Sequence, residues 1–167
     1  MSDKKEYSWN PVTGIPELAV DIEKVFSEEN FPDVDPGWLD ASRHFFGQAY
    51  STSKYGYALT RGAGIFNEYQ GFFKQGQKRR PVRDDFHNNK EGRNFYYKNE
   101  SVPYLTIIEN AINNPETLTK SAKDSLMSVV TENAIYGSDF EQVEDLSWSN
   151  RYSMGRIMQF LQDADLY

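Results

Sequence analysis

The sequence predicts an all-α protein, a single compact domain in which about six or seven helices pack as an irregular bundle. Apolar residues recur at spacings of three and four along most of the 167-residue chain, which is the period of a helix. Alternating β-branched runs joined by hairpin dipeptides are absent from the sequence. The length suits one domain, and 3 Trp, 11 Tyr and 11 Phe provide the apolar area that its core needs.

The first two helices are predicted from proline positions and a cap. Pro16 suits the first position of a helix, and apolar residues follow it with helical spacing as far as Phe26. The turn cluster FPDVDPG comes next, and Asp35 can cap a helix that enters at Pro36. The apolar stripe of this second helix ends at a predicted break over residues 51–54.

The middle of the chain predicts two further helices. An apolar stripe runs from Ala58 to Phe73, and a basic loop, GQKRRP, then precedes a helix predicted from Val82 to Tyr97. Three glycines lie within or just before the stripe that starts at Ala58, and they either weaken that helix or mark close packing against a neighbour. These glycines are Gly56, Gly62 and Gly64.

Three helices are predicted in the last third of the chain. One follows Pro103 with clean helical spacing, and the next begins near Pro115 and ends at a turn at Gly137. The last carries its apolar stripe from Met154 to Leu161. No internal boundary is indicated, so residues 15–167 are predicted to form one domain, and residues 1–14 to form a loose N-terminal segment.

Composition excludes several classes of protein. With no cysteine, the chain has no disulfide scaffold, no thiolate metal site and no cysteine nucleophile. The mean hydropathy is −0.73, and no apolar run approaches the ~20 residues that a membrane span needs. The N-terminus lacks the apolar stretch of a secretion signal. Because there are only two histidines, any metal site must rely on carboxylates and amides.

The net charge of −7 is unevenly distributed. Residues 41–115 sum to +5, whereas both flanking segments are acidic. This partition indicates either ordinary solvated surface or a partner that meets the middle segment. The KRRPVR run is similar to a nucleic-acid patch, but acidic residues follow it at once, which argues against a nucleic-acid partner.

Three polar stretches within residues 37–97 form the candidate site region. The first is Asp40-Ala-Ser-Arg43-His44, the second is Asn67-Glu68-Tyr69, and the third runs from Asp84 to Arg93. In the third stretch, one side of the helix holds polar residues and a glycine where leucine or isoleucine is usual. They are Asp85, Asn88, Asn89, Gly92 and Tyr96. If this side of the helix faces inward, its residues form a buried polar network. If it faces outward, it is ordinary solvent-exposed surface.

Two site candidates have simpler explanations. His44 has Asp40 and Gln48 one turn away on either side, so the three residues could form an exposed ladder. His44 points into a site only if its helix is central and covered on both sides. Glu68 could form an ion pair with Arg61.

In their order, these motifs resemble an uncharacterised helical domain family of bacteria and their phages. That family carries an Asp-x-x-Arg-His helix, a later helix with a glutamate, and a His-Asn-Asn-x-x-Gly-Arg helix. The likeness covers about residues 37–93. It implies an all-helical fold and a clustered polar site, located in a phage virion or the bacterial cytoplasm. The chain departs from the family at Asn67, where a histidine is expected, so one potential ligand is missing.

The candidate catalytic residues are His44, Glu68 and Asp85. One imidazole and two carboxylates could hold a divalent metal ion with water in the open positions. Without metal, the histidine and a carboxylate could act as general acid and base. Alternatively, the cluster is a structural network that fixes helix register. The candidate substrate-binding residues are Arg43, Asn88, Asn89 and Arg93.

The functional hypothesis is a hydrolase that acts on cell-envelope material such as peptidoglycan or phospholipid. The substrate class follows from the resemblance to a phage and bacterial family. The main alternative is a non-catalytic virion or assembly protein that packs against neighbouring subunits. A third is an anion-binding regulator that uses Arg43 and Arg93.

Overall fold

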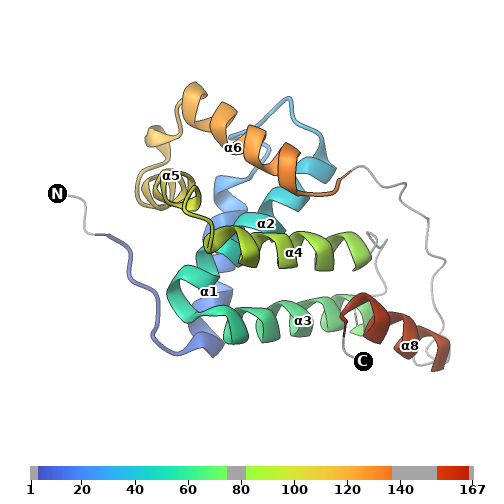
Figure 1. Ribbon diagram of the computed structural model, residues 1–167. Coiled ribbons are helices and arrows are strands. Elements are labelled where there is room, and N and C mark those ends of the chain that lie inside the picture. Colours follow the sequence, from blue (N-terminus) through green and yellow to red (C-terminus); the bar gives the residue numbers. More distant parts are fainter. Residues whose placement is uncertain (1–3, 75–81, 137–153, 166–167) are drawn as a thin grey trace.

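The computed structural model describes residues 4–74, 82–136 and 154–165, and every regular element within them is helical (Figure 1). The predicted all-α fold is therefore confirmed. The elements are α1 (Pro11–Val25), α2 (Pro36–Tyr55), α3 (Tyr57–Lys74), α4 (Val82–Tyr96), α5 (Ser101–Asn113), the 3₁₀ turn η1 (Pro115–Thr117), α6 (Lys120–Asn133) and α8 (Met154–Asp163). The predicted turn at Gly137 and the KRRPVR run up to residue 81 lie outside the described residues.

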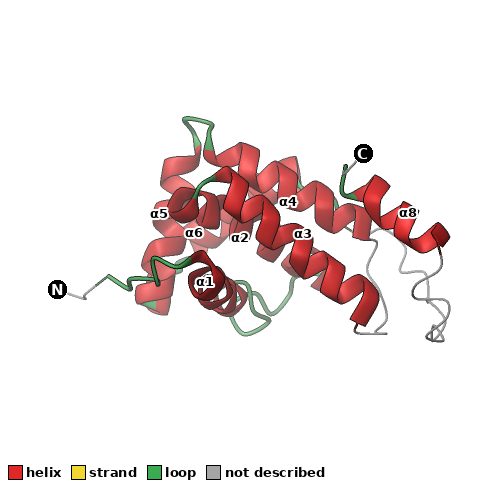
Figure 2. Ribbon diagram, turned by 90° about the horizontal axis from the view of Figure 1, so that it is seen from below, coloured by secondary structure: helices red, strands yellow, loops and turns green. Residues whose placement is uncertain are grey.

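Helix α2 is the centre of the bundle and contacts α1, α3, α4, α5 and α6. Figure 2 shows α3 and α4 side by side over most of their length, with α8 at the far end of the pair. The core around α2 is largely aromatic. Its fully buried rings are Phe26, Phe45 and Phe46. Because α2 is covered by several neighbours, polar residues on more than one of its faces are buried.

Side chains cap the starts of α1, α2 and α6, although the start of α1 was predicted at the wrong residue. The carboxylate of Asp35 accepts hydrogen bonds from the backbone N–H groups of Gly37 at 2.7 Å and Trp38 at 3.3 Å, as predicted. Helix α1 begins at Pro11 rather than Pro16, because the side chain of Asn10 caps it and Pro11 fills its first turn. Pro16 lies inside the helix.

The break between α2 and α3 also differs from the prediction. The helix continues through residues 51–54 and ends at Gly56, whose φ of 81° lies in the left-handed region. Ser51 and Thr52 are buried, and the Thr52 hydroxyl donates to the carbonyl of Gln48 at 2.7 Å. That internal partner allows a polar residue to remain within the helix.

The N-terminal segment is fastened to the bundle along its described part. Lys5 and Tyr7 both donate to the carboxylate of Asp21 on α1. The hydroxyl of Tyr55, at the end of α2, donates to the carbonyl of Ser8 at 2.7 Å. The sequence favoured a loose segment over residues 1–14, whereas residues 4–10 make these contacts and α1 has already begun by Pro11.

A second, smaller apolar cluster joins α8 to α4. The ring of Phe160 packs edge-on against Phe86, with ring centres 5.7 Å apart, and against Tyr69 at the same distance. Phe86 and Phe160 are both buried. Among the described helices, none combines the length and the apolar character that crossing a membrane would require.

Candidate functional site

The candidate site lies where α2, α3 and α4 meet. Helix α2 provides Asp40 and His44, α3 provides Glu68, and α4 provides Asp85 and Asn89. Most of the polar side of α4 faces inward, since Asp85, Asn88 and Asn89 are at most 8% exposed and Gly92 is buried, whereas Tyr96 at its end is half-buried. The sequence-based alternative of an ordinary wet surface for this side is therefore wrong.

A single glycine permits this meeting of helices. A Cβ atom added at Gly92 on α4 would overlap the backbone carbonyl of Phe45 on α2. The two helices therefore approach until their backbones are in contact at this point. Because Phe45 directly follows His44, the close approach brings the imidazole against the polar side of α4.

One nitrogen of the His44 ring is held by an amide and a carboxylate. The Nδ1 atom lies 3.1 Å from Oδ1 of Asn89 and 3.6 Å from Oε1 of Glu68. The amide nitrogen of Asn89 donates to Glu68 Oε1 at 3.4 Å. A carboxylate only accepts, so this bond orients the amide with its oxygen toward the ring. The proton of the imidazole is accordingly assigned to Nδ1.

Two carboxylates lie at the other nitrogen. His44 Nε2 is 3.4 Å from Oδ1 of Asp85 and 3.7 Å from Oδ2 of Asp40. One ligand atom from each of these three residues lies within 4.8 Å of the others, so the group could hold a metal ion. Their side chains are 12–18% exposed, so the group is largely buried.

Opposing effects determine the pKa of His44, and the net result is a raised pKa. Burial of the ring lowers the pKa because it penalises the charged form. The negative charges of Asp85 and Glu68 and the hydrogen bond to Asn89 raise it, whereas Arg43 lowers it. In the metal-free protein, the ring therefore holds its second proton, on Nε2, to a higher pH than a free imidazole does.

This raised pKa predicts how stability depends on pH when metal is absent. When the pKa of a group is higher in the folded than in the unfolded protein, its protonation stabilises the folded state. This stabilisation is complete at pH values below the unfolded-state pKa, here 6.5, and is lost as the pH rises through the folded-state pKa. In EDTA, the free energy of unfolding should fall as pH rises above about 6.5. Urea titrations at a series of pH values measure this. The fall should be absent in His44→Gln and retained in His87→Gln, and a fall of equal size in both would contradict the assignment.

The structure brings together some predicted residues and separates others. His44, Glu68, Asp85 and Asn89 converge, but Glu68 lies at Nδ1 rather than with the two aspartates at Nε2. The sequence grouped Glu68 with His44 and Asp85, whereas in the structure Asp40 lies with Asp85 at Nε2. The spacing of four between Asp40 and His44 fits this contact, but it left an exposed ladder and a covered site both open.

Three of the predicted substrate-binding residues have protein partners outside this cluster. Arg43 Nε donates to the carbonyl of Phe26 at 2.9 Å, close to the end of α1. Asn88 bonds both backbone groups of Ile135, at 2.8 and 2.9 Å, and so fastens the segment after α6. Arg93 Nη1 donates to Oε1 of Gln48 at 2.6 Å, one turn along both helices from the His44–Asn89 contact.

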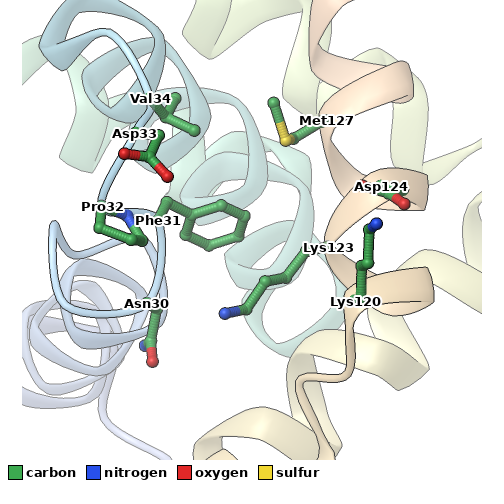
Figure 3. Close-up of a pocket in the computed structure, with 9 residues that line it drawn as sticks. All are labelled: Asn30, Phe31, Pro32, Asp33, Val34, Lys120, Lys123, Asp124 and Met127. Atoms are coloured by element: carbon green, nitrogen blue, oxygen red, sulfur yellow. The ribbon is translucent and has the colours of Figure 1, made fainter.

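A separate cavity of about 250 Å³ lies between the turn after α1 and the start of α6 (Figure 3). The ring of Phe31 faces the cavity, and Lys123 Nζ lies 5.6 Å from its centre. The sequence predicts a turn at FPDVDPG and a helix that begins near Pro115, but no cavity between them. None of the predicted site residues lines the cavity, so it is distinct from the cluster around His44.

Comparison of the chain with protein-family models, curated proteins and solved structures finds no match. The resemblance to a bacterial and phage family therefore stays a prediction.

Proposed function

We propose that the protein is a hydrolase that uses a divalent metal ion bound by Asp40, His44 and Asp85. One observation carries this proposal. Asn89, oriented by Glu68, holds the imidazole with its Nδ1 proton turned away from the aspartates, so the Nε2 lone pair of the neutral ring points at two carboxylates. Unless a proton or a metal ion lies between them, that arrangement is repulsive.

The spacing of the three groups supports a metal ion. Ligand atoms bound at 2.0–2.2 Å in a tetrahedral site are about 3.3–3.6 Å apart. His44 Nε2 lies 3.4 Å from Asp85 and 3.7 Å from Asp40, so small side-chain adjustments would complete the site. Imidazole and carboxylate ligands together suit first-row ions such as Mn²⁺ and Zn²⁺.

The number of protein ligands supports hydrolysis rather than a purely structural role. Structural zinc sites are closed by four protein ligands, whereas catalytic sites have three and leave a position for water. A bound ion would lower the pKa of that water and so supply the nucleophile. The side chains of Asp40 and His44 are 16% and 18% exposed, so the group is not sealed from solvent.

Glu68 and Asn89 act as positioning residues in this proposal. A metal-bound histidine usually donates its other ring N–H to a protein group, which fixes the ring and increases its basicity. Asn89 is that group for His44, and Glu68 holds Asn89 in turn. Glu68, predicted as a catalytic residue, thus supports the site from the side away from the metal.

Cell-envelope material, either peptidoglycan or phospholipid, is the proposed substrate class, by virtue of the resemblance to a bacterial and phage family. The test is an assay of the full chain loaded with Mn²⁺ or Zn²⁺ on purified peptidoglycan, phospholipid vesicles and p-nitrophenyl esters. Metal-dependent hydrolysis that disappears in Asp85→Asn is expected. Metal binding without turnover of any of these substrates would contradict the hydrolase.

Exposed apolar side chains favour the alternative function, a virion or assembly protein. Leu59 and Phe66 lie two turns apart on α3 and are 52% and 59% exposed. Such residues are typical of contacts between subunits. Sedimentation distinguishes the two functions, because an assembly protein should form oligomers that Leu59→Ser/Phe66→Ser disrupts. A monomer at all concentrations would contradict this alternative.

A further inference from the structure

Arg93 is a buried cation without an acidic partner. Its side chain comes from α4 between α2 and α3, and the residue is only 6% exposed. Its Nη1 donates to the neutral amide of Gln48, and its guanidinium lies 5.3 Å from the ring centre of Tyr57. No carboxylate of the described residues pairs with it. A buried charge without an opposite charge is strongly unfavourable, so this guanidinium requires a counter-ion.

Two buried donors, one on the guanidinium itself and one on α3, also lack partners. The Nε–H of Arg93 and the hydroxyl of Thr60 make no hydrogen bond, and Thr60 is fully buried. Tyr57, Thr60 and Gly64 follow at spacings of three and four, so they share one face of α3. Tyr57 lies against Arg93, and a Cβ at Gly64 would crowd the amide of Gln48. Thr60, between them, therefore faces the Arg93–Gln48 pair.

A second positive charge is close by. Burial lowers the pKa of Arg93, a side-chain hydrogen bond with Tyr57 raises it, and the charge of Arg61 lowers it. Arg61 follows Thr60 directly on α3. The surroundings of Arg93 thus combine two cations and two unsatisfied donors, which is the composition of an anion-binding site.

We infer that Arg93 and Thr60 bind an oxyanion, a phosphate or a carboxylate group, between α2, α3 and α4. The Arg93 Nε–H and the Thr60 hydroxyl donate to its oxygens. The planar guanidinium suits a phosphate or a carboxylate, since both offer two oxygens side by side. Gln48 holds the guanidinium in place through its amide oxygen.

This site also defines a substrate class for the proposed hydrolase, and that role rests on the proposed function. Arg93 lies four residues after Asn89, and Gln48 four residues after His44, so the two sites are about 6 Å apart along the helices. An anionic group bound at Arg93 would place a neighbouring bond of the same molecule near Asp40, His44 and Asp85. The substrate is then an ester or amide that carries a phosphate or carboxylate group.

The test is calorimetric titration of inorganic phosphate, and separately of acetate, into the full chain in EDTA at constant ionic strength. Saturable binding of either anion is expected. The decisive variant is Gln48→Glu, which gives Arg93 an internal carboxylate partner and should weaken binding at least about tenfold. Because it pairs a buried charge, its Tm should equal or exceed that of the wild type. Thr60→Val, which removes one donor at nearly constant volume, should weaken binding about threefold or more.

The control is Lys90→Gln, which removes a positive charge from an exposed position of α4 and should leave anion affinity unchanged. No saturable binding by the wild type, or equal affinity in wild type and Gln48→Glu, would overturn the inference. Asp85→Asn separates the two proposals, because it should weaken metal binding by about 100-fold or more and retain phosphate binding. If phosphate binds in EDTA and no metal ion binds, the anion site stands and the metal-dependent hydrolase fails.

Discussion

Replacing Gly92 with alanine is expected to lower the free energy of unfolding by about 3 kcal/mol or more. The new Cβ would overlap the backbone carbonyl of Phe45, which cannot rotate away as a side chain can. Helices α2 and α4 would have to separate at the centre of the bundle. Urea denaturation followed by circular dichroism measures the loss.

Gly62→Ala is the matched control for this prediction. Gly62 lies on α3, is exposed, and has no atom near the position of an added Cβ. Alanine favours the helix there, so the variant should be more stable than the wild type by up to ~1 kcal/mol. Equal losses in the two variants would show that helix propensity rather than contact between α2 and α4 governs position 92.

Replacing Asp85 with asparagine is expected to weaken metal binding by about 100-fold or more, since changes to groups that merely orient a ligand already cost 10–100-fold. Asp85 Oδ1 is the carboxylate oxygen nearer to His44 Nε2. Asparagine keeps the size of the side chain and removes its charge. Titration calorimetry with Mn²⁺ and Zn²⁺ measures the affinity.

Two further variants sharpen this prediction. Asp84→Asn removes the same charge from the neighbouring residue, which lies outside the Asp40–His44–Asp85 group, and should bind metal like the wild type. Asn89→Leu frees the His44 ring without removing a ligand, so a loss of about 10–100-fold is expected. If Asp84→Asn and Asp85→Asn lose affinity equally, general electrostatic attraction explains binding and the site does not.

Much of the fold could be predicted from the sequence because its patterns are local. Apolar spacing and the Asp35 cap depend on neighbours within a turn or two, and the polar side of α4 was visible for the same reason. The first helix was placed too late because Pro11 and Pro16 both fit a first turn. What decides between them is the cap by Asn10, together with the contact of Ser8 with Tyr55 on α2 and of Tyr7 with Asp21 on α1.

The candidate site was less predictable because its contacts join distant parts of the chain. The contact of Arg43 with the carbonyl of Phe26, and of Asn88 with the backbone of Ile135, leaves no trace in residue type or spacing. The spacing of four between Asp40 and His44 does not reveal burial, so an exposed ladder and a covered site both stayed open for Asp40. Only the packing of α2 against α4 decides that Asp40 shares Nε2 of His44 with Asp85, while Glu68 is at the opposite nitrogen.

The orientation of the His44 ring is the central claim, and nitrogen NMR of the histidine side chains tests it most directly. The chain has only two histidines, so His87→Gln assigns the ring signals. On addition of Zn²⁺ at neutral pH, the Nε2 signal of His44 should shift strongly while Nδ1 stays protonated by its bond to Asn89. A metal-induced shift at Nδ1 instead, or no shift at either nitrogen, would contradict the metal site.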